Sequence, residues 1–496
     1  MKKKYIIPFA VIFANIFFSS CEDKKFVKPD RPNIVYLLAD DMGIGDLGCY
    51  NPESKIPTPA MDALAKDGMM FTDAHTNSAV CTPTRYGILT GTYAFRTRLK
   101  SGVLWGSSPT LINKGEATVA SLLRKNGYNT AVIGKWHLGL NWQTLEPNVE
   151  LTDNWQQDNS KIDYSKPILF GPNSVGFDYF FGIPASLDMP PYLYVENQFP
   201  QGIPTEITNE GGRTGLTVPG FKAKNVMPDF TEKAVDFINQ QKPGKPFFLY
   251  FPWAAPHTPV VPNDEFIGKS KAGEYGDFVV ECDATVKKIV QALKEKGLYE
   301  NTIIILTSDN GCSPHGFPIQ QEIEFEHNTS NGFKGRKSHS YEGGHRVPFI
   351  VSWPKQVEAN SVSNEIICTT DLYATVANLL GHEMTLNEAH DSYSFLPILK
   401  NEGYKKPLRE ATIHHSLNGD FSIRKGDWKY IDAKGHGGFG QIKEEIPEDS
   451  IQLYNLANDF AETTNVYLKN QDVVEELKTL LEEYKTKGFS RGSNIE

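Results

Sequence analysis

Four short runs of apolar residues stand out along the chain. They cover residues 33–39 (NIVYLLA), 129–134 (NTAVIG), 246–251 (PFFLYF) and 302–307 (TIIILT). Continuous apolar runs of this length are typical of strands that are buried on both faces of a parallel sheet. We therefore predict four strands of one largely parallel sheet.

Residues that favour helix starts and helix ends occur in the stretches between these runs. They predict helices at about 59–67, after Pro83, at 116–126, at 231–240 and at 274–296. Strands and helices thus alternate, which favours an α/β fold with a large, mixed but mainly parallel sheet flanked by helices. Two long polar stretches, 141–166 and 185–227, show little periodicity, and we expect them to form the rims of a pocket.

The pattern changes towards the C-terminus. Residues 411–416, 421–433 and 451–456 predict short strands without crossover helices between them, and 473–485 predicts an amphipathic helix. We therefore predict a catalytic domain over residues 28–395. A smaller α+β subdomain with an antiparallel sheet should occupy residues 396–496.

The first twenty residues have the layout of an export signal. Lysines at positions 2–4 precede an apolar run over 5–18 that is too short for a comfortable membrane span. Small residues before Cys21 indicate a lipoprotein signal with lipid on that cysteine, and ordinary cleavage near Ser20 is the alternative. We expect an exported protein, in the periplasm or associated with the outer membrane, that contacts a membrane only through this N-terminal anchor.

Composition narrows the class of protein. Six cysteines in 496 residues are too few for a disulfide scaffold, so a core drawn from 40% apolar residues must hold the fold. After Cys21 and Cys81, the remaining cysteines are Cys49, Cys282, Cys312 and Cys368, and no pairing among them can be predicted. The formal charge of −10 argues against nucleic acid as a partner.

Polar side chains follow each of the four predicted strands. They are Asp40 and Asp41, Lys135 and His137, His257, and Asp309 and Asn310. Because ligands of open α/β sheets bind beyond the carboxyl ends of the strands, we expect these residues to form one site. The two acidic strand ends offer only oxygen ligands, which suit Ca²⁺ or Mg²⁺ rather than zinc. Turn or helix-capping roles are the alternative for the aspartates.

The other two strand ends carry cationic or titratable groups. Lys135 and His137 would point to one face of an extended segment, where the lysine can pair with an anion and the histidine can act as a base. His257 has a proline on each side, at 256 and 259, which restricts the local backbone. The alternatives are a surface lysine, a packed histidine and a turn histidine.

Residues 81–91 (CTPTRYGILTG) form the most informative stretch. Thr82 and Pro83 fit the N-cap and the first position of a helix. Cys81 would then lie at or just before a helix N-terminus, where backbone donors and the helix dipole favour anions. Arg85 adds a cation with five fixed donors in the first turn.

This stretch resembles the signature of the type I, formylglycine-dependent sulfatases, which are arylsulfatase-like members of the alkaline phosphatase-like superfamily. The matching residues are Cys81, Pro83, Arg85, Thr90 and Gly91. The resemblance implies that a formylglycine-generating maturation enzyme oxidises Cys81 to an aldehyde, whose hydrate is the nucleophile. It also implies one Ca²⁺ per subunit, bound by Asp40, Asp41, Asp309, Asn310 and an oxygen of the modified Cys81.

The family also has a lysine five residues before the glutamate of an E-G-G motif. Here the motif is at residues 342–344, so the resemblance selects Lys337 and leaves Lys334 as a lysine of the pocket rim or the surface. His345 stands where the family usually has an aliphatic residue. It can contact a sugar or simply pack, and the sequence leaves both alternatives open.

The resemblance assigns a role to each remaining group. Arg85, Lys135 and Lys337 would stabilise the negative charge on the sulfate. His257 would protonate the departing alcohol. His137 would take the proton from the second hydroxyl of the hydrate, which expels sulfate and restores the aldehyde.

We therefore expect a sulfatase that hydrolyses sulfate esters of carbohydrates. The export signal and the polar rims favour an exo-acting enzyme on sulfated galactose or N-acetylgalactosamine units of glycosaminoglycan or algal polysaccharide fragments. One alternative is a phosphatase or phosphodiesterase of the same superfamily. The other is a non-catalytic surface lipoprotein that binds sulfated glycans.

Overall fold

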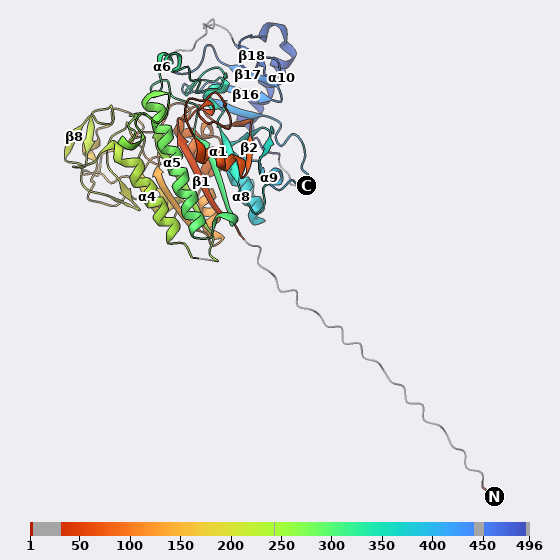
Figure 1. The fold of residues 1–496 in the computed structure, drawn as a ribbon, viewed down its shortest axis with the longest axis horizontal. Coiled ribbons are helices and arrows are strands. Elements are labelled where there is room, and N and C mark those ends of the chain that lie inside the picture. The colour runs from red at the N-terminus through yellow and green to blue at the C-terminus, as the bar shows by residue number, and fades with distance from the viewer. Residues whose placement is uncertain (3–30, 243, 441–450, 493–496) are drawn as a thin grey trace. The chain divides into compact units, whose positions relative to one another are not determined.

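A computed structural model describes residues 1–2, 31–242, 244–440 and 451–492. Its centre is a ten-stranded sheet with the strand order β13-β2-β12-β11-β1-β10-β4-β5-β6-β7 (Figure 1). The strands are β1 (Asn33–Asp40), β2 (Met69–Phe71), β4 (Asn129–Lys135), β5 (Tyr179–Ile183), β6 (Val195–Glu196), β7 (Phe199–Pro200), β10 (Phe247–Pro256), β11 (Thr302–Ser308), β12 (Phe349–Ser352) and β13 (Ser361–Ser363).

The middle of this sheet is parallel, as the apolar runs predicted. β1 pairs in parallel with β10 on one side and with β11 on the other, and β4 continues the parallel set beside β10. The four predicted strands are therefore four direct neighbours in the sheet. Antiparallel pairs follow towards both edges, from β11 to β12 and from β5 to β6, so the sheet is mixed.

Helices cover both faces of the sheet. α1 (Pro59–Lys66), α4 (Val226–Asn239) and α5 (Gly273–Glu295) pack on the face that carries Val35 and Leu37 (Figure 1). On the opposite face, with Tyr36 and Leu38, lie α2 (Cys81–Thr90), α3 (Val119–Lys125), α8 (Leu372–Leu380) and α9 (Leu396–Leu399). Successive side chains of β1 thus enter different cores, as the alternation of a strand requires.

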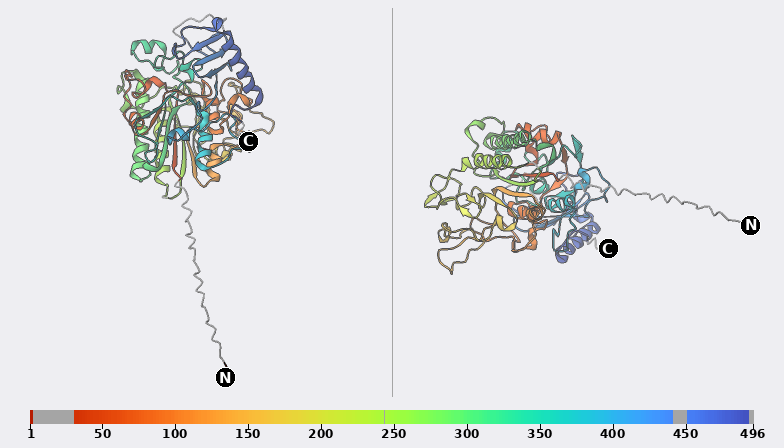
Figure 2. Two further views of the ribbon diagram at one scale, coloured as in Figure 1. Left: turned by 90° about the vertical axis from the view of Figure 1, so that its right-hand side faces the viewer. Right: turned by 90° about the horizontal axis from the view of Figure 1, so that it is seen from below.

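The predicted C-terminal antiparallel sheet is also present (Figure 2). It consists of β15 (Thr412–His415), β16 (Phe421–Lys425), β17 (Trp428–Asp432) and β18 (Gln452–Asn455), in that order. α10 (Gln471–Lys487) packs on it, with Leu477 and Leu481 against Ile423 and Tyr430. The boundary between the domains at residues 395 and 396 stays a prediction.

Several helix starts differ from the prediction. α2 begins at Cys81 rather than Pro83, because Val80 is the extended N-cap residue and the Thr82 hydroxyl instead accepts a hydrogen bond from Leu104 N at 3.2 Å. Pro83 remains in the first turn, where its missing N–H is not needed. α3 begins at Val119, after 116, and α4 begins at Val226, before 231.

Short elements were missed where the sequence shows no period. The second predicted rim contains β6, β7, and the hairpin of β8 (Glu206–Thr208) and β9 (Gly215–Thr217). Further short elements are β3 (Ala74–His75), β14 (Ile367–Cys368), α6 (Ile319–Glu324) and α7 (Glu342–His345). Two to six residues are too few to show a hydrophobic period in the sequence.

Within the described part of the chain, Cys49, Cys81, Cys282, Cys312 and Cys368 are free thiols. The predicted signal peptide from residue 3 onwards and Cys21, the predicted lipidation site, lie outside the described residues. None of the described helices combines the length and the apolar character needed to cross a lipid bilayer.

Candidate active site

The carboxyl ends of the central strands bring together the residues that were predicted from the sequence. Asp40 ends β1, Lys135 ends β4, and Asp309 directly follows β11. We call the group the strand-end cluster. Its members are Asp40, Asp41, Arg85, Lys135, Asp309, Asn310 and Lys337, and all are buried. The parallel pairing explains why residues so far apart in sequence meet.

Arg85 connects α2 to two strand ends. Its guanidinium donates two hydrogen bonds to Asp309 Oδ2, at 2.9 and 2.7 Å, and one to the carbonyl of Lys135 at 3.0 Å. Lys135 Nζ in turn contacts both carboxylate oxygens of Asp40, at 2.9 and 2.8 Å. Burial raises the pKa of Asp40, but Lys135, His257 and Arg85 outweigh it and hold that pKa well below its usual range.

Asp41 is the second centre of the cluster. Its backbone is left-handed, with φ of 70°, which turns its carboxylate away from the direction of β1. Lys337 Nζ lies 2.7 Å from Asp41 Oδ1, and Asn310 Nδ2 donates to the same oxygen at 2.7 Å. His257 Nε2 lies 3.5 Å from Asp41 Oδ2.

Cys81 is 2% exposed and is the first residue of α2. Burial raises the pKa of its thiol above the ordinary value, although the charges of Lys135 and Lys337 act to lower it. The carboxylates of Asp309 and Asp40 also raise the pKa of this thiol, so Cys81 lies among the members of the strand-end cluster. A thiol that stays protonated is a poor nucleophile.

The strand-end cluster fits a hard divalent cation. Three carboxylates and the amide of Asn310 supply oxygen, and Asn310 Oδ1 has no hydrogen-bond partner among the described residues although it is buried. Burial and the neighbouring carboxylate of Asp40 raise the pKa of Asp309, despite Arg85. Repulsion between these carboxylates is what a dication would relieve.

His137 is oriented for proton transfer, though not by an extended strand. Its φ of 55° is left-handed and β4 already ends at Lys135, so the prediction that both side chains share one face of a strand is wrong. His137 Nε2 contacts the carbonyl of Leu104 at 2.8 Å and therefore carries the proton. Nδ1 has no partner in the described part of the chain, and burial together with Lys135 lowers the pKa of His137. A neutral imidazole with a free lone pair can act as a base.

His257 has the complementary arrangement. Its Nδ1 faces the carbonyl of Thr258 at 2.7 Å, which leaves Nε2 directed at Asp41 and available to hold or give a proton. Ser186 lies beside it, with its Oγ 3.3 Å from the ring and 3.1 Å from Lys135 Nζ. Sequence reasoning missed Ser186, because a serine in an aperiodic rim carries no local signal, although the rim itself was predicted to border the pocket.

The register of the glycine motif selected the right lysine for the cluster. Lys337 contacts Asp41, whereas Lys334 Nζ donates to the carbonyl of Glu462 at 2.8 Å and lies 4.8 Å from the centre of the Tyr341 ring. Lys334 is thus bound to the C-terminal subdomain and is neither a rim nor a solvent lysine. His345 is fully buried and packs, which settles the alternative left open by the sequence.

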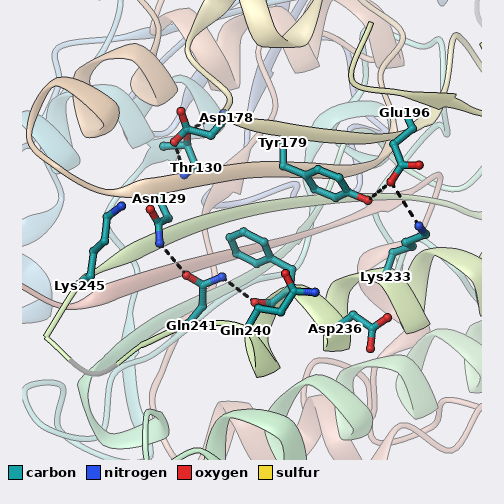
Figure 3. Close-up of a pocket in the computed structure, with 11 residues that line it drawn as sticks. Asn129, Thr130, Asp178, Tyr179, Glu196, Lys233, Asp236, Gln240, Gln241 and Lys245 are labelled. Carbon is teal, nitrogen blue, oxygen red and sulfur yellow. Dashed lines mark hydrogen bonds and ion pairs between the residues drawn. The ribbon is translucent and has the colours of Figure 1, made fainter. Parts of the chain in front are cut away.

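A separate cavity of about 610 Å³ lies at the opposite end of the strands (Figure 3). Asn129 and Tyr179, which begin β4 and β5, line it together with Gln241 and residues near the end of α4. Figure 3 shows a hydrogen bond between Asn129 and Gln241, and Glu196 contacts both Tyr179 and Lys233. Because Lys135 lies at the other end of β4, this cavity is not the candidate active site.

Buried oxygen donors, three cationic side chains and a buried cysteine at the start of a helix together suit the hydrolysis of an anionic ester. The chain belongs to the sulfatase family, because residues 32–382 match the model of that family. Residues 333–487 also match the model described as N-sulphoglucosamine sulphohydrolase, C-terminal. The protein is therefore a sulfuric ester hydrolase.

Individual relatives cover nearly the whole chain. An N-acetylgalactosamine-6-O-sulfatase of Bacteroides thetaiotaomicron is 35% identical over 92% of this chain and 94% of its own length. The N-acetylgalactosamine-6-sulfatase of Mus musculus is 32% identical over 81% of this chain and 73% of its own. A solved structure described under the metabolism of multiple glycosaminoglycans by Bacteroides thetaiotaomicron has a TM-score of 0.80 and 33% identity, over 92% of this chain and all of that one.

Proposed function

We propose that this sulfatase removes the 6-O-sulfate from N-acetylgalactosamine or galactose units at the ends of glycosaminoglycan fragments. The similarity to an N-acetylgalactosamine-6-O-sulfatase over nearly the full length of both chains carries the choice of sugar and position. The burial of the strand-end cluster supports exo action, since Lys337 is only 5% exposed. A chain end can insert its sulfate into such a site more readily than the middle of a polymer can.

We also propose that Cys81 is converted to formylglycine by a maturation enzyme and that the oxygen ligands bind one Ca²⁺. When Cys81 is oxidised, the hydrated aldehyde supplies a hydroxyl that attacks sulfur and a second hydroxyl that later expels sulfate. When bound, Ca²⁺ supplies positive charge beside the sulfate. Asp40, Asp41, Asp309 and the Asn310 amide would hold it, which leaves Lys135 and Lys337 less tightly paired with their carboxylates.

Individual side chains then stabilise charge and transfer protons. Lys135, Lys337 and Arg85 stabilise the negative charge that spreads over the sulfate oxygens, as preorganised cations do. His257 gives a proton from Nε2 to the departing sugar oxygen. Because Nδ1 already donates its own proton to the Thr258 carbonyl, this step requires a second proton on Nε2, which faces Asp41 Oδ2. His137 accepts a proton on Nδ1 and remains neutral until then.

The proposal of export rests on the N-terminal sequence alone. Three lysines, an apolar run and small residues before Cys21 support a lipid anchor and a place in the periplasm or at the outer membrane. Labelling cells with a palmitate analogue tests it. The wild-type chain should be labelled and Cys21→Ser should not, and label on both variants would contradict the anchor.

The first experiment is mass spectrometry of the tryptic peptide that contains Cys81, from protein made in its own host. Conversion replaces sulfur by oxygen with loss of hydrogens, so the peptide becomes lighter, and the hydrate adds a water. Sulfate release from 6-sulfated and 4-sulfated N-acetylgalactosamine is then measured with the same preparation. A thiol-only peptide without turnover would leave a glycan-binding lipoprotein, and preference for the 4-sulfate would contradict the proposed position.

Calcium binding is tested separately from activity. If the oxygen ligands bind Ca²⁺, the free energy of unfolding should rise by about 2.7 kcal/mol at a calcium concentration one hundred times the dissociation constant. Asp309→Asn should remove most of this gain. Equal stabilisation of the wild type and of Asp309→Asn by calcium would mean that the ion binds elsewhere.

A further inference from the structure

Asp188 stands apart from the other acidic side chains near the site. It lies in the rim that follows β5, two residues after Ser186, whose hydroxyl contacts Lys135 and His257. Asp188 is only 8% exposed, and its Oδ1 is buried without a hydrogen-bond partner among the described residues. An acceptor in this state is costly to maintain unless a ligand supplies the donor.

Arg213 holds the other oxygen of this carboxylate. Its guanidinium binds Asp188 Oδ2 and donates to the Asp188 carbonyl at 3.2 Å. The Arg213 side chain is 44% exposed and lies 5.3 Å from the centre of the Trp105 ring. Tyr192 fixes the backbone of Arg213 through a 2.6 Å hydrogen bond from its hydroxyl to the arginine carbonyl. The pair is therefore anchored, and the Arg213 side chain remains reachable from solvent.

Charged groups of the proposed sulfate site change the pKa of Asp188. Burial raises the pKa of Asp188, but His257, Arg213 and Lys135 outweigh it and keep the pKa below the ordinary value. Asp188 is thus an ionised acceptor at neutral pH. A fixed carboxylate repels sulfate, so Asp188 does not act with Arg85, Lys135 and Lys337 on the sulfate. It requires a neutral hydrogen-bond donor instead.

His315, from another part of the chain, lies close enough to several of these groups to interact with their charges. Burial lowers the pKa of His315, and the charges of Lys337, Asp41, His257 and Arg213 also act on it. The ring stacks on Phe439 with centres 4.8 Å apart and planes at 26°. Apolar ring faces around a few fixed polar groups are typical of small-molecule sites.

We propose that Asp188 and Arg213 form the sugar-binding part of the site and recognise the ring hydroxyls of the sulfated sugar. Asp188 Oδ1 accepts a hydrogen bond from a hydroxyl, and the exposed guanidinium of Arg213 donates to an oxygen of the same ring. This inference rests on the proposed function and deepens it, because it states which residues distinguish a sugar sulfate from any other sulfate ester. A polyol supplies the donors that Asp188 lacks, whereas an aryl sulfate supplies none.

The experiment compares kcat/KM for 6-sulfated N-acetylgalactosamine and for 4-nitrophenyl sulfate. Asp188→Asn should lower the sugar-to-aryl ratio by about 10- to 100-fold, since a hydrogen bond to a charged group is lost. Arg213→Ala should lower it by about tenfold. Asp264→Asn removes an exposed carboxylate that only faces Lys224 at 3.5 Å, and it should leave the ratio unchanged. An unchanged ratio in Asp188→Asn, or an equal fall on both substrates, would overturn the proposal.

A binding measurement separates this proposal from the proposed function. In a Cys81→Ala background, the affinity for 6-sulfated N-acetylgalactosamine should fall about tenfold or more when Asp188→Asn is added. If the wild type hydrolyses neither substrate, the proposed activity fails, but this loss of affinity still supports the sugar-binding pair. If the affinity does not change, the pair does not bind sugar, whatever the turnover. The melting temperature of each variant shows that it is folded.

Discussion

Two of the buried polar clusters in the described part of the chain differ in how their charges are arranged, and the candidate active site is one of them. The strand-end cluster pairs the carboxylates of Asp40, Asp41 and Asp309 with Arg85, Lys135 and Lys337. The second, which we call the histidine cluster, joins the catalytic domain to the C-terminal sheet. Its members are Asp73, His75, Glu342, His345, His414, Arg424 and Lys429, and all are buried.

Most side chains of the histidine cluster find partners within it, although His414 Nε2 is buried without one among the described residues. His75 Nε2 contacts Asp73 at 2.7 Å, its Nδ1 faces His345 Nδ1 at 3.1 Å, and His345 Nε2 faces Lys429 Nζ at 3.0 Å. If Asp73 accepts a hydrogen bond from His75 and Lys429 donates one to His345, both rings are neutral. Each of these three contacts then joins a donor to an acceptor. Lys429 therefore occupies the lone pair of His345 that a metal ion would need.

The difference shows what distinguishes a site from a support. Both clusters are buried and charged, so neither property identifies function. Asn310 Oδ1 of the strand-end cluster and the neighbouring His137 Nδ1 are buried acceptors without partners among the described residues, but so is His414 Nε2 of the histidine cluster. The clusters differ instead in the charges around their carboxylates: burial and Asp40 raise the pKa of Asp309, whereas Glu342 of the histidine cluster is held by Lys429, Arg346 and Arg424.

The largest expected effect is the loss of turnover on replacing Cys81. Cys81→Ala should lower kcat by roughly 10⁶-fold, since it removes the group that becomes the nucleophile. Sulfate release from 6-sulfated N-acetylgalactosamine measures it. Cys368→Ala changes another fully buried free thiol and should retain activity. Appreciable turnover by Cys81→Ala would refute the proposed chemistry of the strand-end cluster.

A charge removed from the histidine cluster should act on stability instead. Glu342→Gln leaves Lys429 without one of its buried carboxylate partners, at 3.1 Å, and should lower the free energy of unfolding by about 3–5 kcal/mol. Urea unfolding measures it. Glu410→Gln, in an exposed pair with Lys425 at 3.0 Å, should change stability by less than about 1 kcal/mol. A stable Glu342→Gln variant that has lost catalysis would make the two clusters functionally alike.

Two lysines three residues apart allow a direct comparison of a residue inside the strand-end cluster with one outside it. Lys337→Ala should lower kcat/KM by about 10²–10³-fold, because a cation that stabilises the reacting sulfate is lost. Lys334→Ala removes a contact to the Glu462 carbonyl and should change kcat/KM by less than about threefold, with any loss appearing in stability. Kinetics on the sugar sulfate, with unfolding curves of both variants, separate these effects. Equal losses of activity would contradict the assignment of the site lysine.

The two clusters also differ in how far the sequence predicts them. The strand ends within the strand-end cluster were predicted because parallel strands end at one edge and each apolar run is followed by its polar residues. The resemblance to the sulfatase family added Arg85 and Lys337. The histidine cluster was not predicted, since its members come from short elements that are far apart in the sequence; Arg424 and Asp73, for example, are 351 residues apart. The sequence shows no local period for such pairs, so only the folded chain brings them together.

Ser186 and Asp188 show the same limit inside the active site. The sequence predicts that their stretch borders the pocket, but nothing within it marks which side chains face the sulfate or the sugar. The left-handed backbone of His137 is a further case, because a strand prediction cannot foresee where the chain leaves the strand. Single positions in loops depend on packing against distant elements, here Lys135 for Ser186 and Arg213 for Asp188.

The smallest effect concerns pH. Burial lowers the pKa of His414 well below its ordinary value of about 6.5, so the unfolded chain binds a proton below that pH that the folded chain does not. Stability from this residue is complete above about pH 7 and is lost as the pH falls, by up to about 1.4 kcal/mol per pH unit.

His414→Asn removes this titration while its amide can still donate to the Thr76 carbonyl, which His414 Nδ1 contacts at 2.7 Å. We expect the slope of unfolding free energy against pH between 6 and 5 to fall by about 1.4 kcal/mol per unit in the variant. At pH 8 neither form titrates, so the difference measured there reports packing alone. An identical slope in both proteins would mean that His414 is protonated in the folded state, and the histidine cluster would then carry an unbalanced charge like a site that awaits an anion.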